Sequence, residues 1–259
     1  LGVQSMNDCI LVDAKRGHTA QEVVDAVARL KRRGMTVGVQ LLPGLKGETW
    51  ETILETAIAV VKLEPDFVRI YPVLVIENTE LADQYRSGEY EPLSTEQAIK
   101  YCAFLKEWFE QHNIEVIRTG LQSTEELDSG NSLIAGPYEP AMGELVVNEQ
   151  YKQRIERCID EHLSSENLLG KQNDYNFSHF DCYHTHKVKC RFNSDGDDIL
   201  MKHRIVISYP RSGTSKVRGL KNCNILYFQE MYPQFSIDWC EDNTRNTVRC
   251  CIDGLQYML

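Results

Sequence analysis

The chain has 259 residues, of which 42% are hydrophobic and 25% charged, a composition that excludes a disordered chain and indicates a globular protein. Its net charge of −10 disfavours nucleic-acid binding over the whole surface, although a local basic patch remains compatible with it. No apolar run approaches the roughly 20 residues that a bilayer-spanning helix needs, so we expect no membrane partner.

The first part of the chain alternates between strand and helix patterns. An apolar stretch at residues 1–5 looks like the end of a strand, and residues 19–33 show helical spacing, with Thr19 and Glu22 placed as in a capping box. The run at 35–42 is mostly apolar and does not alternate strictly, which is typical of a strand buried in a parallel sheet. Helices at 49–63 and from residue 94 alternate with strands at 65–72 and 114–121. This order predicts parallel β/α units, in an open α/β sheet or in a β/α barrel.

The second part of the chain has a different character. Residues 120–143 are rich in Gly, Pro and Ser and predict an ordered loop or crossover segment, after which helical spacing returns at 149–163. A polar, irregular stretch with one expected strand at 186–191 follows. Residues 204–240 then predict strand, helix and strand. We therefore divide the chain into a β/α part (1–118), a loop or crossover (119–150) and a small α+β domain (151–259).

Four segments stand in a distinctive order: LGVQS at 1–5, RGHT at 16–19, LLPGLKGET at 41–49 and VRIYPVLV at 68–75. This set resembles the radical S-adenosylmethionine (SAM) enzymes, and within them the Elongator catalytic-subunit-like and the oxygen-independent coproporphyrinogen oxidase-like proteins. The resemblance covers roughly residues 1–145. It implies that residues 1–118 form the C-terminal part of a β/α barrel of that type. The implied reaction is radical hydrogen abstraction, and the substrate stays open, with tRNA as the favoured class.

The resemblance also implies cofactor-binding residues. Gln4, at the end of the first strand, matches a glutamine that contacts the ribose or the amino-acid part of SAM, and an amide can donate and accept hydrogen bonds at once. Arg16 matches an arginine that pairs with the cofactor carboxylate, which a guanidinium holds bidentately. Gln40 stands near the ribose, where relatives often carry Asp or His. The segment that holds the adenine matches the backbone of Tyr71, Pro72 and Val73.

Each of these residues has a plainer interpretation when it is taken alone. Gln4 is then a turn or surface residue, Arg16 a solvated charge beside a helix, and Tyr71 a core aromatic.

Enzymes of this type also bind a [4Fe-4S] cluster through three cysteines at CxxxCxxC spacing, because thiolates are the ligands of such clusters. None of the nine cysteines stands in such a triplet. We therefore expect the C-terminal portion of a longer enzyme, whose full-length form carries SAM and the cluster and which does no chemistry through this chain alone. The cysteines themselves predict reduced thiols and a cytoplasmic location. A half barrel with exposed strand edges that does not fold alone is an alternative.

The segment CYHTHKVKC offers soft ligands for a metal ion: Cys182, His184, His186 and Cys190. Their spacing matches no standard zinc site, and alternation along a strand puts neighbours on opposite faces. We therefore predict no metal site there.

Residues 206–237 resemble the strand–helix–loop–helix–strand core of KH-type RNA-binding domains. The segment GLKN at 219–222 stands where that family has a GxxG loop that clamps the nucleic-acid backbone, and Asn222 tolerates the positive φ of the missing glycine. The candidate RNA-binding residues are Lys216, Arg218, Gly219 and Lys221. The alternative function is accordingly a non-catalytic scaffold or an RNA-binding module that acts through a KH-like C-terminal domain. The plainest interpretation of this domain is a small α+β fold without a ligand.

Overall fold

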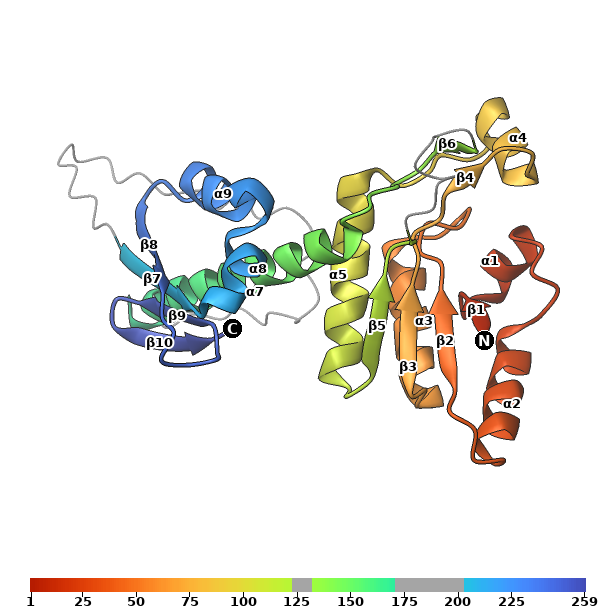
Figure 1. The fold of residues 1–259 in the computed structure, drawn as a ribbon, viewed down its shortest axis with the longest axis horizontal. Helices are drawn as coiled ribbons and strands as arrows, with labels where there is room; N and C mark the ends of the chain where they lie inside the picture. Colours follow the sequence, from red (N-terminus) through yellow and green to blue (C-terminus); the bar gives the residue numbers. More distant parts are fainter. Residues whose placement is uncertain (123–131, 171–202) are drawn as a thin grey trace. The chain divides into compact units, whose positions relative to one another are not determined.

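A computed structural model describes residues 1–122, 132–170 and 203–259. Contacts between Cα atoms divide the chain into two compact units, Leu1–Tyr151 and Lys152–Leu259, each with its own sheet (Figure 1). Helix α7 (Met142–Gly170) begins in the first unit and continues into the second. In the described parts of the chain, no helix combines the length and the apolarity that crossing a membrane requires.

Four short parallel strands form the main sheet of the first unit. They are β1 (Gly2–Gln4), β2 (Gly38–Leu41), β3 (Phe67–Ile70) and β5 (Glu115–Thr119), and they lie side by side in that order. The connections contain α1 (Asp8–Asp13), α2 (Ala20–Lys31), α3 (Trp50–Leu63) and α5 (Thr95–Gln111). The prediction of parallel β/α units is therefore confirmed.

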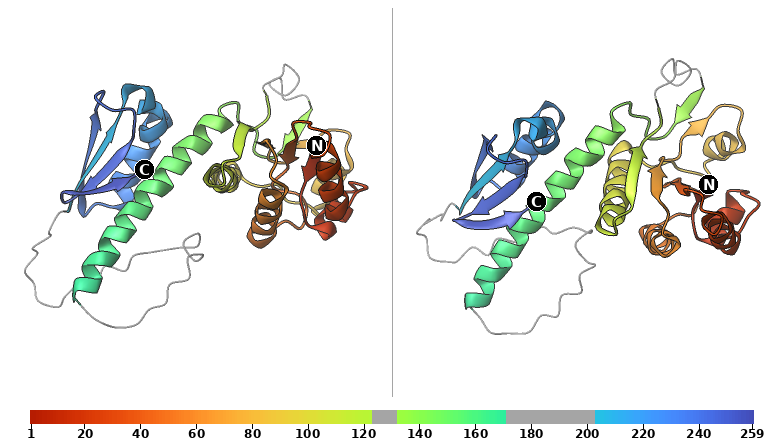
Figure 2. Two further views of the ribbon diagram at one scale, coloured as in Figure 1. Left: turned by 90° about the horizontal axis from the view of Figure 1, so that it is seen from below. Right: turned by 60° about the horizontal axis from the view of Figure 1, so that its bottom comes forward.

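The helices cover one face of this sheet (Figure 2). Val39 of β2 and Val68 of β3 are fully buried in a core that includes Val27 of α2, Ile53 of α3 and Phe104 of α5. Alternation of side chains along a strand directs the intervening residues to the opposite face. That second face of the sheet carries the polar residues of β2 and β3.

A smaller group of two strands and one helix in the first unit lies beyond the ends of these strands. The short strands β4 (Val75–Ile76) and β6 (Leu133–Ala135) pair antiparallel, and α4 (Glu80–Ser87) follows β4. Their packing forms a separate apolar cluster that includes Val75, Ala82 and Tyr90. The prediction of an ordered loop or crossover segment over residues 120–143 did not include β6, whose partner β4 lies far away in the sequence.

The second unit is a mixed sheet packed on the C-terminal part of α7. Its strands are β7 (His203–Tyr209), β8 (Phe235–Glu241), β9 (Arg249–Ile252) and β10 (Leu255–Met258), in the spatial order β10-β9-β7-β8. Strands β7 and β8 are parallel, and the helices α8 (Thr214–Arg218) and α9 (Cys223–Met231) connect them. Short 3-10 turns, η2 (Arg211–Gly213) and η3 (Leu220–Asn222), precede α8 and separate α8 from α9.

The small α+β domain predicted from the sequence is thus present, with some differences. The expected single helix is divided into α8 and α9, the expected helix at 149–163 is the middle of the longer α7, and the hairpin β9–β10 was not foreseen. The expected strand at 186–191 lies outside the described residues. The strand–helix–loop–helix–strand order agrees with the prediction, and the likeness to KH domains stays a prediction.

Candidate functional site

The cofactor-binding residues predicted from the sequence lie in or directly after strands of the main sheet. Gln4 ends β1, Gln40 lies in β2, and residues 71–73 follow β3. The carboxyl ends of parallel strands meet at one edge of a sheet, which is where β/α folds place their binding sites. This edge is therefore the candidate site.

Gln4 has an unusual conformation. Its φ is 64°, in the left-handed region that costs a non-glycine residue about 1 kcal/mol or more. Its side chain is 4% exposed, and within the described residues its buried Oε1 has no hydrogen-bond partner. A buried acceptor without a donor costs about 1–3 kcal/mol unless a ligand or water satisfies it. A left-handed φ and a buried acceptor without a donor are both features that occur at ligand-binding positions.

The side chains of Arg16 and Gln4 both lie close to Gly2. A Cβ atom on residue 2 would lie 2.6 Å from Nε2 of Gln4 and 3.5 Å from a terminal guanidinium nitrogen of Arg16. Arg16 follows α1, where its backbone N–H donates to the carbonyl of Leu11 at 2.9 Å, and its side chain is exposed. The structure thus brings together an amide and an exposed guanidinium beside Gly2, where the missing Cβ makes room for the Gln4 amide.

Gln40 lies next to Gly2 in the neighbouring strand, since the two residues are paired in the register of β1 and β2. On its other side Gln40 is paired with Arg69, and Arg69 is paired with Arg118 of β5. The sequence analysis did not select either arginine. Each lies in a mostly apolar strand, and that interruption was the available signal. Together they add two positive charges along the sheet.

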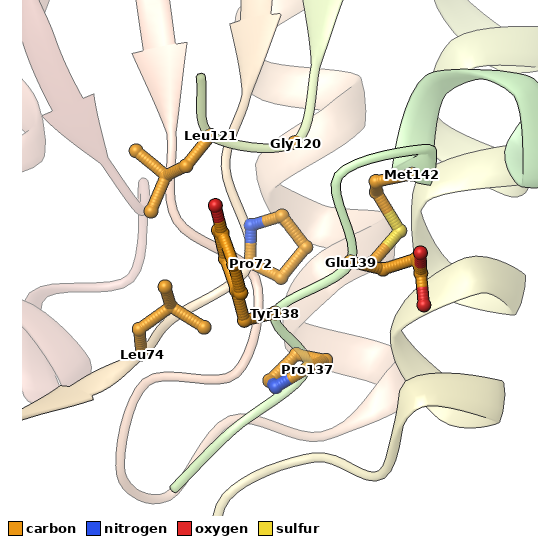
Figure 3. A pocket seen from close by; sticks show the side chains of 8 residues that line it. All are labelled: Pro72, Leu74, Gly120, Leu121, Pro137, Tyr138, Glu139 and Met142. Atoms are coloured by element: carbon orange, nitrogen blue, oxygen red, sulfur yellow. The ribbon is translucent and has the colours of Figure 1, made fainter. Parts of the chain in front are cut away.

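The segment predicted to hold the adenine lies over the ends of β2 and β3. The N–H of Tyr71 donates to Leu41 at 2.9 Å, and the N–H of Val73 donates to Pro43 at 2.9 Å, so this backbone is fixed in place. Pro72, between them, lines a small cavity (Figure 3). The other lining residues are mainly apolar: Leu74, Gly120, Leu121, Pro137, Tyr138, Glu139 and Met142.

The lining of this cavity comes from segments far apart in the sequence. In Figure 3 the ring of Tyr138 stands in the middle of the lining residues, and the Glu139 carboxylate points away from them. Gly120 ends β5 with φ 81°, and a Cβ there would lie 2.5 Å from Cβ of Met142. The close approach of β5 to the start of α7 therefore requires glycine, and it closes one side of the cavity.

The turn PGLKGE between β2 and α3 is organised by Glu48, which the sequence analysis did not single out. Its Oε2 accepts a hydrogen bond from the N–H of Gly44 at 2.6 Å, and the hydroxyl of Tyr90 donates to the carbonyl of Gly44 at 2.7 Å. Burial raises the pKa of Glu48 to about 7, against the lowering effect of the N–H groups of Gly44 and Leu45. A protonatable carboxyl group thus holds the loop that follows β2.

His18 is a further residue of this region that sequence reasoning missed, although it belongs to the quoted RGHT segment. Its Nδ1 lies 3.3 Å from the carbonyl oxygen of Arg16. Its Nε2 is buried and, within the described ranges, has no hydrogen-bond partner. It is positioned to fix the loop that carries Arg16.

The four candidate RNA-binding residues surround the turn between α8 and α9. Gly219 has φ 78°, and a Cβ there would lie 2.4 Å from Sγ of Cys223, so the turn requires glycine. Lys221 and Asn222 are also left-handed, with φ of 53° and 63°. Lys216 and Lys221 are exposed, whereas Arg218 is half-buried. The two lysines are the charges that a ligand reaches most easily.

The four Cys and His residues between 182 and 190 lie outside the described residues.

The comparisons with known proteins define the class of the first unit. The model of the radical SAM superfamily matches residues 1–59, and the model of the Radical_SAM C-terminal domain matches residues 65–153. Over these residues the chain belongs to the radical SAM superfamily, which confirms the resemblance found in the sequence.

Within that superfamily its relatives are of the Elongator type. The tRNA uridine(34) acetyltransferase of Methanocaldococcus jannaschii is 38% identical over 109 residues, which are 41% of this chain and 20% of the relative. The enzyme of the same name from Methanocaldococcus infernus is 32% identical over 167 residues, 61% of this chain and 29% of the relative. Elongator complex protein 3 of Homo sapiens is 29% identical over 106 residues, 40% of this chain and 19% of the relative.

A solved structure agrees with these relatives. The archaeal Methanocaldococcus infernus Elp3 with an N-terminal deletion superposes with a TM-score of 0.50 and 30% identity, over 59% of this chain and 35% of that chain. The chain therefore covers about a fifth to a third of the length of the relatives that it matches.

Proposed function

We propose that the first unit binds S-adenosylmethionine as part of an Elongator-like radical SAM enzyme that modifies tRNA. The observation that carries this proposal is that Gln4 and Arg16 both lie beside Gly2, and that the buried Gln4 Oε1 has no hydrogen-bond partner in the part of the chain that the structure describes. Members of the superfamily use SAM and a [4Fe-4S] cluster.

The residues present fit SAM in three respects. The Gln4 amide faces a position where a hydroxyl or amino group of the cofactor would satisfy its oxygen. The exposed guanidinium of Arg16 suits the carboxylate of the methionyl part. The backbone of residues 71–73, fixed by two hydrogen bonds, suits an adenine, whereas the cavity beside Pro72 and Tyr138, with a volume of about 10 Å³, has no room for the ring and would have to widen. Bound SAM supplies the radical in this family; the residues named here bind and orient it.

The residues of this chain do not fit the [4Fe-4S] cluster in the same way. The sequence contains no CxxxCxxC triplet, and so its residues offer no ligand set of the kind that holds a [4Fe-4S] cluster. We derive no step of the reaction through it.

The proposal is tested by SAM binding to the purified full chain, measured by calorimetry. We expect Arg16→Ala to weaken binding about 10- to 100-fold, since hydrogen bonds to a charged partner contribute about 1.5–3 kcal/mol. Gln4→Asn keeps a residue that tolerates the left-handed φ but shortens the amide, and it should weaken binding as well. Arg33→Ala removes an exposed arginine at the end of α2 and serves as control. Equal affinity of Arg16→Ala and the unmodified chain, or no binding at all, would contradict the proposal.

The tRNA part of the proposal rests on the names of the relatives and on the exposed Lys216 and Lys221 beside Gly219. An RNA-binding module without catalysis is the second candidate, and it rests on the same two lysines.

In a gel-shift assay with total tRNA at low salt, the double variant Lys216→Glu/Lys221→Glu should bind more weakly. Each lost phosphate contact should lower the slope of log affinity against log salt by about 1. The control Lys62→Glu makes the same kind of charge change on α3. Unchanged binding by the double variant would refute the RNA contact.

A further inference from the structure

Three side chains with metal-binding chemistry converge in the second unit. They are His162 of α7, His203 at the first position of β7, and Asp253 in the turn between β9 and β10. Nitrogen and oxygen atoms of the three, one from each, lie within 4.8 Å of one another. Oδ2 of Asp253 is 2.6 Å from Nδ1 of His203 and 3.4 Å from Nε2 of His162. Residues far apart in the sequence thus direct two imidazoles and one carboxylate to one point.

The backbone fixes the carboxylate. Asp253 and Gly254 have φ of 49° and 88°, the left-handed values of a tight hairpin turn. Oδ1 of Asp253 accepts from the N–H of Arg204 at 2.8 Å, and the N–H of Asp253 donates to the carbonyl of Arg204 at 3.0 Å. This clamp holds the turn against β7 and leaves Oδ2 directed to the histidines.

His162 is held in an equally defined way. Its side chain is 3% exposed, and its Nδ1 lies 3.0 Å from the hydroxyl of Tyr257. When Nδ1–H donates to that hydroxyl, Nε2 turns its lone pair toward the carboxylate oxygen. Two electron-rich atoms at this distance need a proton or a cation between them. A histidine whose second ring nitrogen is hydrogen-bonded is also the usual form of a metal-ligating histidine.

We propose that His162, His203 and Asp253 form a binding site for a divalent transition-metal ion, with Zn²⁺ as the ion that suits two imidazoles and a carboxylate. Three protein ligands leave a fourth position of the ion open to water. In a tetrahedral zinc site, bonds of about 2.0–2.2 Å place the ligand atoms about 3.3–3.6 Å apart. The 3.4 Å between Asp253 and His162 fits this spacing, whereas the 2.6 Å contact of Asp253 with His203, which is partly exposed, is expected to lengthen on binding. The ion would join α7 to β7 and to the β9–β10 hairpin.

The test uses the full chain and Zn²⁺ alone as the probe. Because the segment 182–190 contains other soft ligands, all measurements use a background variant that carries Cys182→Ser, His184→Gln, His186→Gln and Cys190→Ser. The chain is first stripped with a chelator, and Zn²⁺ is then added. We expect elemental analysis to find one retained Zn²⁺ per chain, and we expect the unfolding temperature of the chain to rise. A Co²⁺-loaded sample should lack the thiolate charge-transfer absorption, since no cysteine is a ligand.

Three further variants identify the site. Asp253→Asn keeps the acceptor for the Arg204 N–H, and His162→Gln and His203→Gln keep polar side chains. Each should weaken zinc binding at least 10-fold and abolish the thermal response, while the far-ultraviolet circular dichroism stays that of the background. His112→Gln, at the exposed end of α5, is the matched control and should bind as the background does. Absence of retained zinc in the background, or unchanged affinity in Asp253→Asn, would show that the three side chains form only a hydrogen-bonded network and would overturn the proposal.

Discussion

At the scale of single residues, Glu48 shows how a buried charge sets a pH dependence. Its carboxyl group is held by the N–H of Gly44, yet burial dominates and raises its pKa from 4.5 to about 7. The folded chain therefore binds a proton between these two pH values that the unfolded chain has released. Stability must then fall as the pH rises through this range, which is the reverse of the usual behaviour of an ion-paired carboxylate.

The variant Glu48→Gln should remove this dependence. Its amide oxygen can still accept the Gly44 N–H, but it has no proton to lose, so the variant should be more stable than the unmodified chain above pH 7, by on the order of 1–3 kcal/mol. Urea unfolding at pH 5, 6, 7 and 8 measures the difference. Glu55→Gln, which removes an exposed carboxylate of α3, controls for the loss of one charge. Parallel pH profiles for Glu48→Gln and the unmodified chain would disprove the role assigned to burial.

The residues of the candidate site were predictable from sequence only where a family pattern marked them. Gln4 and Arg16 were found through their positions in LGVQS and RGHT, and the structure brings them together. Arg69 and Arg118 were missed because, although a charge inside a strand was an available signal, no family pattern marked either position. The group of His162, His203 and Asp253 was missed for a stronger reason: it depends on the packing of a helix, a strand and a turn, and no spacing along the chain encodes that contact.

At the scale of elements, the sequence was informative where local interactions decide the structure. Thr19 caps α2 with Glu22 in the capping box that the sequence predicts. The four strands of the main sheet were found because each is a short stretch with apolar residues that alternates with helical segments. Strands β4, β6, β9 and β10 have two to four residues each, and pairing with a distant or hairpin partner defines them rather than their own pattern.

The end of α3 offers a test at this scale. Glu64 terminates the helix in the left-handed conformation, with φ 50°, where glycine is the usual residue. We expect Glu64→Gly to stabilise the chain by roughly 0.5–1 kcal/mol, because relief of the left-handed strain exceeds the entropic cost of glycine. The lost ion pair with Lys31 is long, at 3.9 Å, and exposed on the glutamate side, so it contributes little.

Glu64→Ala is the matched control for this change, since it removes the same carboxylate but retains a Cβ. Urea denaturation of both variants separates the two effects. If alanine stabilised the chain as much as glycine does, then the charge and not the backbone conformation would be the cause.

At the scale of the whole molecule, two cores exist in one chain. The first contains Cys102, which is fully buried among the helices and strands of the first unit. The second contains Cys158 of α7 and Cys250 of β9, both buried in the second unit. Burial raises the pKa of the Cys102 thiol, and the hydrogen bond with Cys158 together with burial raises the pKa of the Cys250 thiol. Cys9, Cys223 and Cys240 are exposed.

These thiols report on the folding of each unit separately, and so they test the expectation, raised by the sequence, that an open half barrel does not fold alone. N-ethylmaleimide should modify Cys9, Cys223 and Cys240 quickly in the native chain. Cys102 and Cys250 should react slower by a factor on the order of 10³, because their modification requires opening of a core whose stability is several kcal/mol. Mass spectrometry of proteolytic peptides assigns each rate. Rapid modification of Cys102 together with protection of Cys250 would mean that the second unit folds and the first does not, and the SAM site proposed on the first unit would then need a partner to form.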